Sequence, residues 1–363
     1  MRVRKIFCAC TLLCLYFVLL ACNTTETEVS VDYENNRINF KEVLYQNPVF
    51  EPVLADPTIV QSGEFFYAYG TEDNWGSQGG YHLIPVIKSK DLVSWELVGD
   101  AMQQKPKWKD KGGIWAPDVT EVDGRYYMYY SFSTWGDPNP GIGVAIADSP
   151  QGPFVDQGKV FLSKEIGVEN SIDPFYIEED GKKYLFWGSF HGIYAIQLSD
   201  DGRKVIGEKK YIASDHLEAV YVYKKDGNYY LFGSAGSCCE GANSTYKVLV
   251  GRSSSLLGPY TDKGGNSFTE GDFGELLIKG HEGEQGFAGP GHNAEIVSDD
   301  KGAEWFLYHA MKKDEARLDN GTNRRSLMLD KIIWVDGWPS IEGSQPGISE
   351  TQAPFFQQED NKE

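Results

Sequence analysis

The stretch EAVYVYKKDGNYYLFGS at residues 218–234 decides the fold of this chain, because its pattern occurs five times. Each copy has a run of alternating apolar residues, a turn that contains glycine, and a run of aromatic residues. The other copies are DPTIVQSGEFFYAYG (56–70), APDVTEVDGRYYMYY (116–130), DPFYIEEDGKKYLFWGSF (173–190) and NAEIVSDDKGAEWFLYH (293–309). Such runs favour strands, and Asp-Gly or Ser-Gly favours the turn between them. Each copy therefore predicts a pair of antiparallel strands.

The spacing of the copies predicts how these strand pairs are arranged. Successive copies begin 45 to 75 residues apart, which is enough for four strands and their loops. Repeats of this length, each with one four-stranded sheet, are typical of a propeller. We therefore expect an all-β fold, a five-bladed β-propeller that forms one domain over residues 41–345, followed by a polar C-terminal tail over residues 346–363.

The first residue of each copy is expected at the central channel, because the opening strand of a blade lines it. Three of these positions are the carboxylates Asp56, Asp173 and Glu218. Carboxylates that converge repel one another when ionised, so their pKa values move apart and the set can supply both an acid and a base. The alternative is a structural role, in which each carboxylate accepts backbone N–H groups or pairs with a basic residue. For Asp118, two residues after the second copy begins, both interpretations remain open.

The charge of the chain limits its partners. Lys and Arg total 34 and Asp and Glu total 53, for a formal net charge of −19. Nucleic acid is therefore not expected as a partner, and an acidic polysaccharide is disfavoured. Neutral glycans remain open.

The N-terminus has the pattern of a targeting segment. Basic residues at positions 2, 4 and 5 precede an apolar stretch that ends in Leu19-Leu20-Ala21-Cys22. A stretch this short predicts a signal peptide over residues 1–21, and its ending resembles a bacterial lipobox, in which the cysteine is lipidated. Residues 22–40 would then be a polar tether from Cys22 to the domain, and the protein a membrane-anchored lipoprotein, periplasmic or at the cell surface. The alternative is a secreted protein with a free Cys22.

Besides Cys22, two cysteines remain after such processing, and they are adjacent. Cys238 and Cys239 cannot join distant elements, and no second Cys/His pair stands at zinc-ligand spacing. Buried thiols and a disulfide between the neighbours both remain open.

Several short motifs, in order along the chain, resemble glycoside hydrolase family 43, and most of all its α-1,5-L-arabinanases. The resemblance covers roughly residues 45–340. Its motifs are Ala55-Asp56-Pro57, SKDLVSW (89–95), Trp115-Ala116-Pro117-Asp118, Ser171-Ile172-Asp173-Pro174, Glu218, CCEGANSTY (238–246), VGRS (250–253), Gly258-Pro259-Tyr260 and Gly291-His292-Asn293.

The resemblance implies a role for each of the three carboxylates. Asp56 would be the general base that activates water, Glu218 the general acid that protonates the leaving oxygen, and Asp173 the group that orients the acid and tunes its pKa. The family acts with inversion, for which the acid and the base stand about 6.5–9.5 Å apart to admit a water molecule.

The resemblance also implies an ion. Arabinanases of this family place a histidine beside a calcium or sodium ion on the propeller axis, and His292 matches its Gly-His-Asn setting. Such an ion would offset the repulsion among the carboxylates. The alternative is a histidine that only forms hydrogen bonds with the backbone.

Five further residues are candidates for binding sugar. Trp75 and Trp135 lie in Gly-rich, polar stretches that predict loops over the blade mouths, where packing does not explain an exposed tryptophan. Trp115 is either a third aromatic platform or part of the core. Asn170 and Ser189, near the carboxylate of the third copy, would bind sugar hydroxyl groups or cap strand ends.

The sequence departs from the arabinanase pattern at two places. Ala55 stands where these enzymes usually have His before the base, and Val220 where they usually have Pro after the acid. We expect a monomeric, inverting glycosidase that cleaves α-1,5-L-arabinofuranosyl bonds in arabinan, a neutral plant polysaccharide. The alternatives are an exo-acting enzyme on arabinofuranosides or similar pentosides or galactofuranosides, and a glycan-binding propeller without activity.

Overall fold

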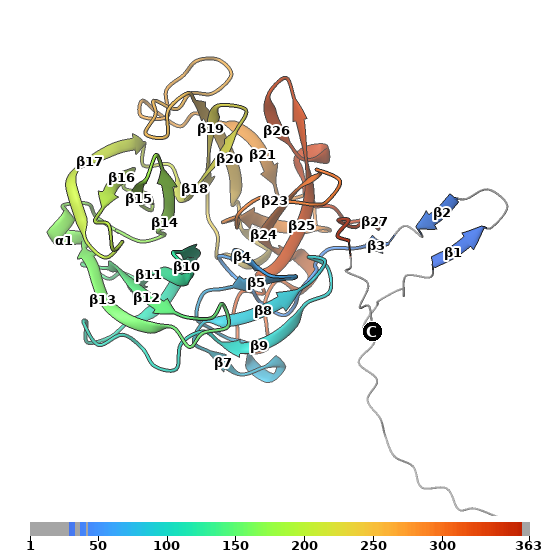
Figure 1. Cartoon of the computed structure of the whole chain (residues 1–363), viewed down its shortest axis with the longest axis horizontal. Coiled ribbons are helices and arrows are strands. Elements are labelled where there is room, and N and C mark those ends of the chain that lie inside the picture. The colour runs from blue at the N-terminus through green and yellow to red at the C-terminus, as the bar shows by residue number, and fades with distance from the viewer. Residues whose placement is uncertain (1–28, 33–36, 41–42, 358–363) are drawn as a thin grey trace, which may run out of the picture. The chain divides into compact units, whose positions relative to one another are not determined.

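The computed structural model describes residues 29–32, 37–40 and 43–357 (Figure 1). The chain divides into two units, residues 1–43 and residues 44–363. In the first unit, β1 (Val29–Asp32) and β2 (Arg37–Phe40) form an antiparallel pair. The predicted signal peptide and Cys22 lie outside the described residues. No helix within the described part of the chain is both long and apolar enough to cross a membrane.

The second unit is built from five antiparallel sheets that follow one another along the chain, which confirms the predicted five-bladed propeller (Figure 1). Blade I contains β4 (Thr58–Ser62), β5 (Phe65–Tyr69), β8 (Pro85–Ser89) and β9 (Glu96–Asp100). Blade II contains β10 (Gly113–Val122), β11 (Arg125–Ser133), β12 (Gly141–Ala147) and β13 (Val155–Leu162). Blade III contains β14 (Phe175–Glu179), β15 (Lys182–Trp187), β16 (Ile193–Leu198) and β17 (Val205–Ala213).

Blade IV contains β18 (Glu218–Lys225), β19 (Asn228–Ala235), β20 (Lys247–Ser253) and β21 (Glu275–Lys279). Blade V contains β22 (Phe287–Gly291), β23 (Val297–Ser298), β24 (Glu304–Lys312), β25 (Ser326–Val335) and β26 (Trp338–Ser340). Its innermost strand is interrupted, since β22 and β23 both pair with β24. The short elements between and beside the blades are β3 (Leu44–Tyr45), β6 (Asp73–Asn74), η1 (Gly76–Gln78), β7 (Tyr81–His82), α1 (Ser163–Ile166), η2 (Gly241–Asn243), η3 (Lys313–Glu315), η4 (Glu342–Ser344) and β27 (Thr351–Gln352).

The aromatic residues of the repeats fill the space between neighbouring blades. Phe161 packs on Trp187 between blades II and III, with ring centroids 4.9 Å apart. Phe232 and Phe306 meet in the same way between blades IV and V. Burying such rings stabilises the fold by about 1.5–3 kcal/mol each, which explains why the repeat requires them.

The two ends of the domain meet and close the propeller. The strand β27 pairs with β3, and the backbone N–H groups of Val49 and Leu54 donate to the carbonyls of Leu327 in β25 and of Arg325 just before it. Near the C-terminus, Phe356 packs against Phe66 of blade I, with ring centroids 4.9 Å apart. The packed domain therefore extends past residue 345, which corrects the prediction of a separate tail for residues up to Phe356.

In each blade, one non-glycine residue in the left-handed conformation lies in or directly beside the innermost strand. These residues and their φ values are Asp56 (52°), Ala116 (43°), Asp173 (57°), Ala219 (55°) and His292 (45°). Such a conformation costs about 1–2 kcal/mol. In blades II and IV the strand register shifts across this residue, and in blade V it shifts just before it, between Ala288 and Gly291. This repeated feature corrects the predicted alignment of the copies. Glu218 stands one residue before the equivalent position and Asn293 one residue after it.

At four of the five blade junctions, a side chain at the end of a second strand accepts a hydrogen bond from this left-handed residue of the next blade. The pairs are Ala116 N–H to Thr71 Oγ1 (2.8 Å), Asp173 N–H to Ser131 Oγ (2.9 Å), His292 N–H to Ser234 Oγ (2.9 Å) and Asp56 N–H to His309 Nδ1 (3.0 Å). At the III–IV junction the corresponding residue, Ser189, instead donates to the Glu218 carboxyl group. The Glu218 carboxyl group, which belongs to the site described below, therefore replaces the backbone N–H as the partner of this side chain at the III–IV junction.

Candidate active site

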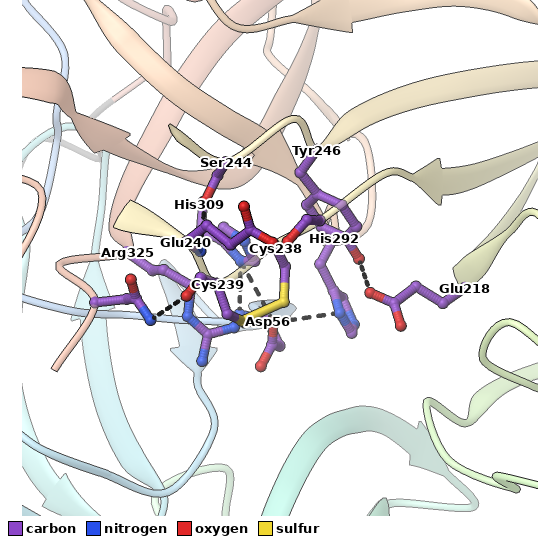
Figure 2. The surroundings of a disulfide bond; sticks show 12 residues. Asp56, Glu218, Cys238, Cys239, Glu240, Ser244, Tyr246, His292, His309 and Arg325 are labelled. Carbon is purple, nitrogen blue, oxygen red and sulfur yellow. Dashed lines mark hydrogen bonds and ion pairs between the residues drawn. A yellow bond between two sulfur atoms is a disulfide. The ribbon is translucent and has the colours of Figure 1, made fainter. Parts of the chain in front are cut away.

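The three lead carboxylates converge in one cavity at the centre of the propeller. Asp56, Asp173 and Glu218 all line this cavity, which has a volume of about 1540 Å³ and receives residues from all five blades. Each of the three side chains is almost completely buried. Figure 2 shows Asp56 and Glu218 with some of the neighbours described below. The structure thus brings together residues that are up to 162 positions apart in the sequence (218 − 56).

Asp56 lies among positively polarised partners. Its Oδ1 accepts a hydrogen bond from Arg325 Nη1 at 2.8 Å, and its Oδ2 accepts one from Thr71 Oγ1 at 2.6 Å. Burial alone would raise the pKa of Asp56, but the Arg325 guanidinium group, the neighbouring imidazoles and the Thr71 hydroxyl hold it below its ordinary value. Asp56 is therefore ionised at neutral pH and can act as a base.

Glu218 has neutral partners instead. Tyr246 OH donates to Oε1 and Ser189 Oγ to Oε2, both at 2.6 Å. Burial raises the pKa of Glu218, although both hydroxyl groups oppose this shift, and the charge of Asp56 raises it further. Glu218 therefore holds a proton more tightly than an ordinary glutamate and can act as an acid.

Asp173 is the third member of the set. Burial, then the nearby Glu218 and Asp56, raise its pKa well above the ordinary value, while the N–H of Ala219 favours its charged form. Its carboxyl group therefore touches the residue next to Glu218 and senses the charge of both other carboxyl groups. This position suits a group that adjusts the proton affinity of the acid.

His292 lies beside the base. Its Nδ1 is 3.3 Å from Asp56 Oδ1, and burial lowers its pKa, so the imidazole is neutral near pH 7. Within the described residues, no group of three or more His, Cys, Asp or Glu side chains is arranged to hold a metal ion. Calcium and sodium prefer oxygen ligands, so an ion at His292 would depend largely on water molecules. The axial ion stays a prediction.

Comparison with known proteins identifies the family. The family model described as "Glycosyl hydrolases family 43" matches residues 45–339, which is most of the chain. The chain belongs to glycosyl hydrolase family 43. This confirms the resemblance drawn from the sequence motifs and makes the protein a glycosidase.

Relatives within family 43 carry two kinds of name. The extracellular endo-α-(1→5)-L-arabinanase 1 of Bacillus subtilis is 33% identical over 302 residues, covering 79% of this chain and 87% of its own. The extracellular exo-α-(1→5)-L-arabinofuranosidase of Cellvibrio japonicus is 30% identical over 320 residues, covering 80% and 86%. The solved structure of Cellvibrio cellulosa α-L-arabinanase with arabinohexaose has a TM-score of 0.69 at 30% identity, covering 80% of this chain and 96% of that one.

The prediction that Trp75 is a sugar platform of this family 43 enzyme is wrong. Trp75 is only 2% exposed and does not line the cavity. Its ring packs between His82, with centroids 4.1 Å apart, and Phe50. The Gly-rich stretch around it does form a turn, η1, but this turn folds back and buries the indole instead of presenting it to a ligand.

The other two tryptophans line the cavity. Trp135 is 82% exposed, and its ring centroid is 5.8 Å from that of the partly buried Trp115. Sequence reasoning missed Phe190, which also lines the cavity and is 38% exposed. Phe190 was not predicted because it ends the third copy of the repeat, and the aromatic residues of the repeat are expected to lie in the core.

Asn170 and Ser189 lie beside the acid rather than free in the cavity. Asn170 Nδ2 donates to Ser189 Oγ at 3.0 Å, and Ser189 in turn donates to Glu218. The two residues thus form a chain of hydrogen bonds that fixes the acid. Both also line the cavity, so contact with a sugar is compatible with this role.

Sequence reasoning missed Arg325, Tyr246 and Thr71 as partners of the carboxylates. Tyr246 ends the CCEGANSTY motif, which was the available signal for it. Arg325 immediately precedes β25, outside the repeated phrase, so only the fold reveals it. The unusual residues Ala55 and Val220 are buried and do not line the cavity, so these departures alter packing behind the site.

Asp118 has a structural position. It does not line the cavity, and its Oδ2 accepts the Tyr176 N–H of blade III at 2.8 Å. Its carboxyl group is also hydrogen-bonded to that of Glu295, and burial followed by this neighbour raises the pKa of Asp118 well above its ordinary value. The pair therefore holds a proton between two carboxyl groups away from the cavity.

Proposed function

We propose that this glycosidase hydrolyses α-1,5-L-arabinofuranosyl bonds in arabinan, within the chain and with inversion. One observation carries the proposal: a single cavity holds two carboxyl groups whose pKa values are shifted in opposite directions. Burial acts on both, but Arg325 and the other partners lower the pKa of Asp56, whereas burial and the charge of Asp56 raise the pKa of Glu218. This division of roles is what inverting hydrolysis requires. The names of the family 43 relatives supply the choice of arabinan.

The residues can perform the reaction as follows. Asp56 takes a proton from a water molecule, and Arg325 keeps the carboxylate ionised until then. The water oxygen attacks the anomeric carbon as Glu218 gives its proton to the leaving oxygen. Ser189 and Tyr246 hold the acid in place and stabilise the carboxylate that forms.

The cavity supports action within a chain. Its volume of about 1540 Å³ exceeds the roughly 300–1,000 Å³ typical of sites for one small ligand, so several linked sugars can enter. The exo-acting Cellvibrio japonicus relative supports the second candidate, release of single arabinose units from chain ends.

Product analysis separates these candidates. Linear arabinan should give a ladder of oligosaccharides at early times if bonds within the chain are cut, and arabinose alone if cleavage is at chain ends. NMR of the first product should show inversion of the anomeric configuration. Absence of products from every arabinan and arabinofuranoside tested would refute the proposed activity.

We also propose that Cys22 is lipidated and holds the enzyme on the outside of the cell membrane. The lipobox-like sequence Leu19–Cys22 and the extracellular names of the relatives support this. The variant Cys22→Ala should leave the membrane fraction with unchanged turnover. Mass spectrometry that finds an unmodified Cys22 in the mature protein would refute the anchor.

We also propose that a calcium or sodium ion lies on the propeller axis beside His292. His292 would hold it through its second ring nitrogen, and its positive charge would help to keep Asp56 ionised. Chelation or transfer to sodium-free buffer should lower kcat clearly, while the melting temperature should change little. Elemental analysis without calcium, together with kinetics that do not respond to chelators or sodium, would refute the ion.

A further inference from the structure

The adjacent cysteines form a disulfide at the cavity. Cys238 and Cys239 are bonded through their sulfur atoms, which decides between the two states left open by the sequence. Both residues line the same cavity as Asp56 and Glu218, and both are partly exposed. Figure 2 shows the surroundings of the disulfide, which include Asp56, Arg325 and His292 of the same cavity. A bond between neighbours cannot join distant elements, so its position at the cavity needs another explanation.

The apolar surface of the cavity is divided unevenly between the blades. Blades II and III supply all the aromatic and aliphatic side chains among the described lining residues, namely Trp115, Trp135, Pro138, Val168, Ile172 and Phe190. Blades IV and V supply Glu218, Gly236, Ser237, Cys238, Cys239, Glu240, His292, Gly321, Thr322, Asn323 and Arg325. On that half, the disulfide is the one apolar surface among the described lining residues.

The segment that carries the disulfide is held firmly. Asn323 of blade V donates to the Cys239 carbonyl and accepts the Gly241 N–H, both at 3.0 Å. Gly236, which precedes the segment, has a φ of +89°, and a side chain there would meet the Thr245 carbonyl at 2.6 Å. The sulfur atoms are thus held in place before any ligand arrives, which lowers the entropy lost on binding.

We propose that the Cys238–Cys239 disulfide is a sugar-binding surface of the active site. It takes the C–H face of an arabinofuranosyl ring on the side of the scissile bond formed by blades IV and V, where no aromatic platform is available. Sulfur is polarisable and packs well against apolar C–H groups, and the covalent ring presents both sulfur atoms together. This inference rests on the proposed function, because it names a part of that same site.

Ligand binding without turnover gives the most direct test. In the inactive Glu218→Gln background, calorimetry would measure the Kd of arabinohexaose with and without Cys238→Ser and Cys239→Ser together. We expect binding to weaken about tenfold when the disulfide is replaced, a change of the size that one lost ring contact produces. The matched control is Asn243→Ala, an exposed residue of the same segment that does not line the cavity and should leave Kd unchanged.

A second measurement separates sugar contact from mere support of Tyr246, which follows the segment and holds Glu218. With Glu218 intact, the disulfide variant should raise KM while the pH dependence of kcat stays unchanged. A shifted pH profile with unchanged Kd would overturn the inference in favour of a supporting role. If the double variant does not fold, reduction of the Glu218→Gln protein by a phosphine, with circular dichroism to monitor the fold, replaces it.

The remaining outcomes are also decisive. Free thiols at both positions in the folded, purified enzyme would overturn the inference, as would a Kd within twofold of the parent. If the Glu218→Gln protein with its disulfide binds arabinohexaose and the wild type cleaves arabinan, either of these results refutes only the role of the disulfide and leaves the proposed function standing. If neither occurs, the proposed function fails and the inference fails with it.

Discussion

The junction between blades III and IV differs from the other four in how the blades are joined. Elsewhere, a side chain at the end of a second strand accepts the backbone N–H of the next blade's left-handed residue. Between blades III and IV, Ser189 occupies this position and donates to the Glu218 carboxyl group instead. The Ala219 N–H that Ser189 would have accepted is bonded to the Asp173 carboxyl group. A structural link of the fold has thus become a support for the acid.

Blades III and IV are instead held together by an aromatic contact. Further along the same strands, Phe175 and Tyr221 meet edge to face with centroids 5.2 Å apart. At the I–II junction, the corresponding level holds a polar link, in which Thr58 Oγ1 accepts the Val119 N–H. Aromatic packing therefore replaces a hydrogen bond below the acid, and the two kinds of contact are of similar strength.

The largest expected effect tests whether Glu218 is catalytic or only a link between blades. Glu218→Gln keeps the size and most hydrogen-bonding capacity of the side chain but cannot give up a proton, so kcat should fall about 10²–10⁴-fold. Thermal unfolding should remain close to that of the wild type. Near-normal turnover in a folded variant would show that Glu218 is structural like its counterparts at the other junctions.

The next effect concerns the base. Arg325 lowers the pKa of Asp56, and the reaction needs Asp56 ionised, so activity rises as pH rises through this pKa. Removing the guanidinium group in Arg325→Gln should raise the pKa and move the acidic limb of the kcat/KM profile upward by about one to three pH units. The alkaline limb, which reports the loss of the proton from Glu218, should move much less.

Arg325→Lys is the matched control, because it keeps the positive charge while losing the planar fork. It should restore most of the acidic limb. An unchanged acidic limb in Arg325→Gln would mean that Asp56 is not the group that titrates there.

A smaller effect separates the two kinds of junction directly. Ser189→Ala removes a donor that lowers the pKa of Glu218, so the alkaline limb should move to higher pH and kcat should fall about tenfold, the effect of about 1.4 kcal/mol. Ser234→Ala, at the IV–V junction, leaves the His292 N–H without its partner and should lower the melting temperature with kcat within about twofold. Equal effects on stability and turnover in both variants would contradict the distinction.

The repeat predicts the blades because a pattern of period two, broken by glycine turns, has few other ways to bury its aromatic rings. It also predicts that Asp56, Asp173 and Glu218 meet. It could not reveal that blade IV is offset by one residue, since φ at Ala219 depends on contacts from blade III. Nor could it separate the buried Trp75 from the exposed Trp135, because both lie in Gly-rich turns and only the packing around each indole differs.

The smallest effect concerns the other carboxyl pair, Asp118 and Glu295, which holds a proton without lining the cavity. Burial raises the pKa of both groups. The folded state therefore keeps a proton that the unfolded chain loses near pH 4, so the stability present at low pH is lost as pH rises through the folded pKa values. Glu295→Gln should remove most of this dependence. Its amide can donate to Asp118 while its carbonyl, in the place of Oε2, accepts the Ile59 N–H and the Thr58 hydroxyl, as Glu295 Oε2 does.

Melting temperatures of Glu295→Gln and wild type from pH 4 to 9 would test this. The curves should diverge as pH rises, with the variant losing less stability by a few degrees, while kcat stays unchanged because the pair lies outside the cavity. Asp330 provides an internal reference, because burial raises its pKa to about 6 and its own contribution persists in both proteins. Parallel curves would mean that the pair shares no proton. A drop in kcat would mean instead that Asp118 and Glu295 are coupled to the catalytic pair, Asp56 and Glu218. The distinction between a structural pair and a catalytic pair would then not hold.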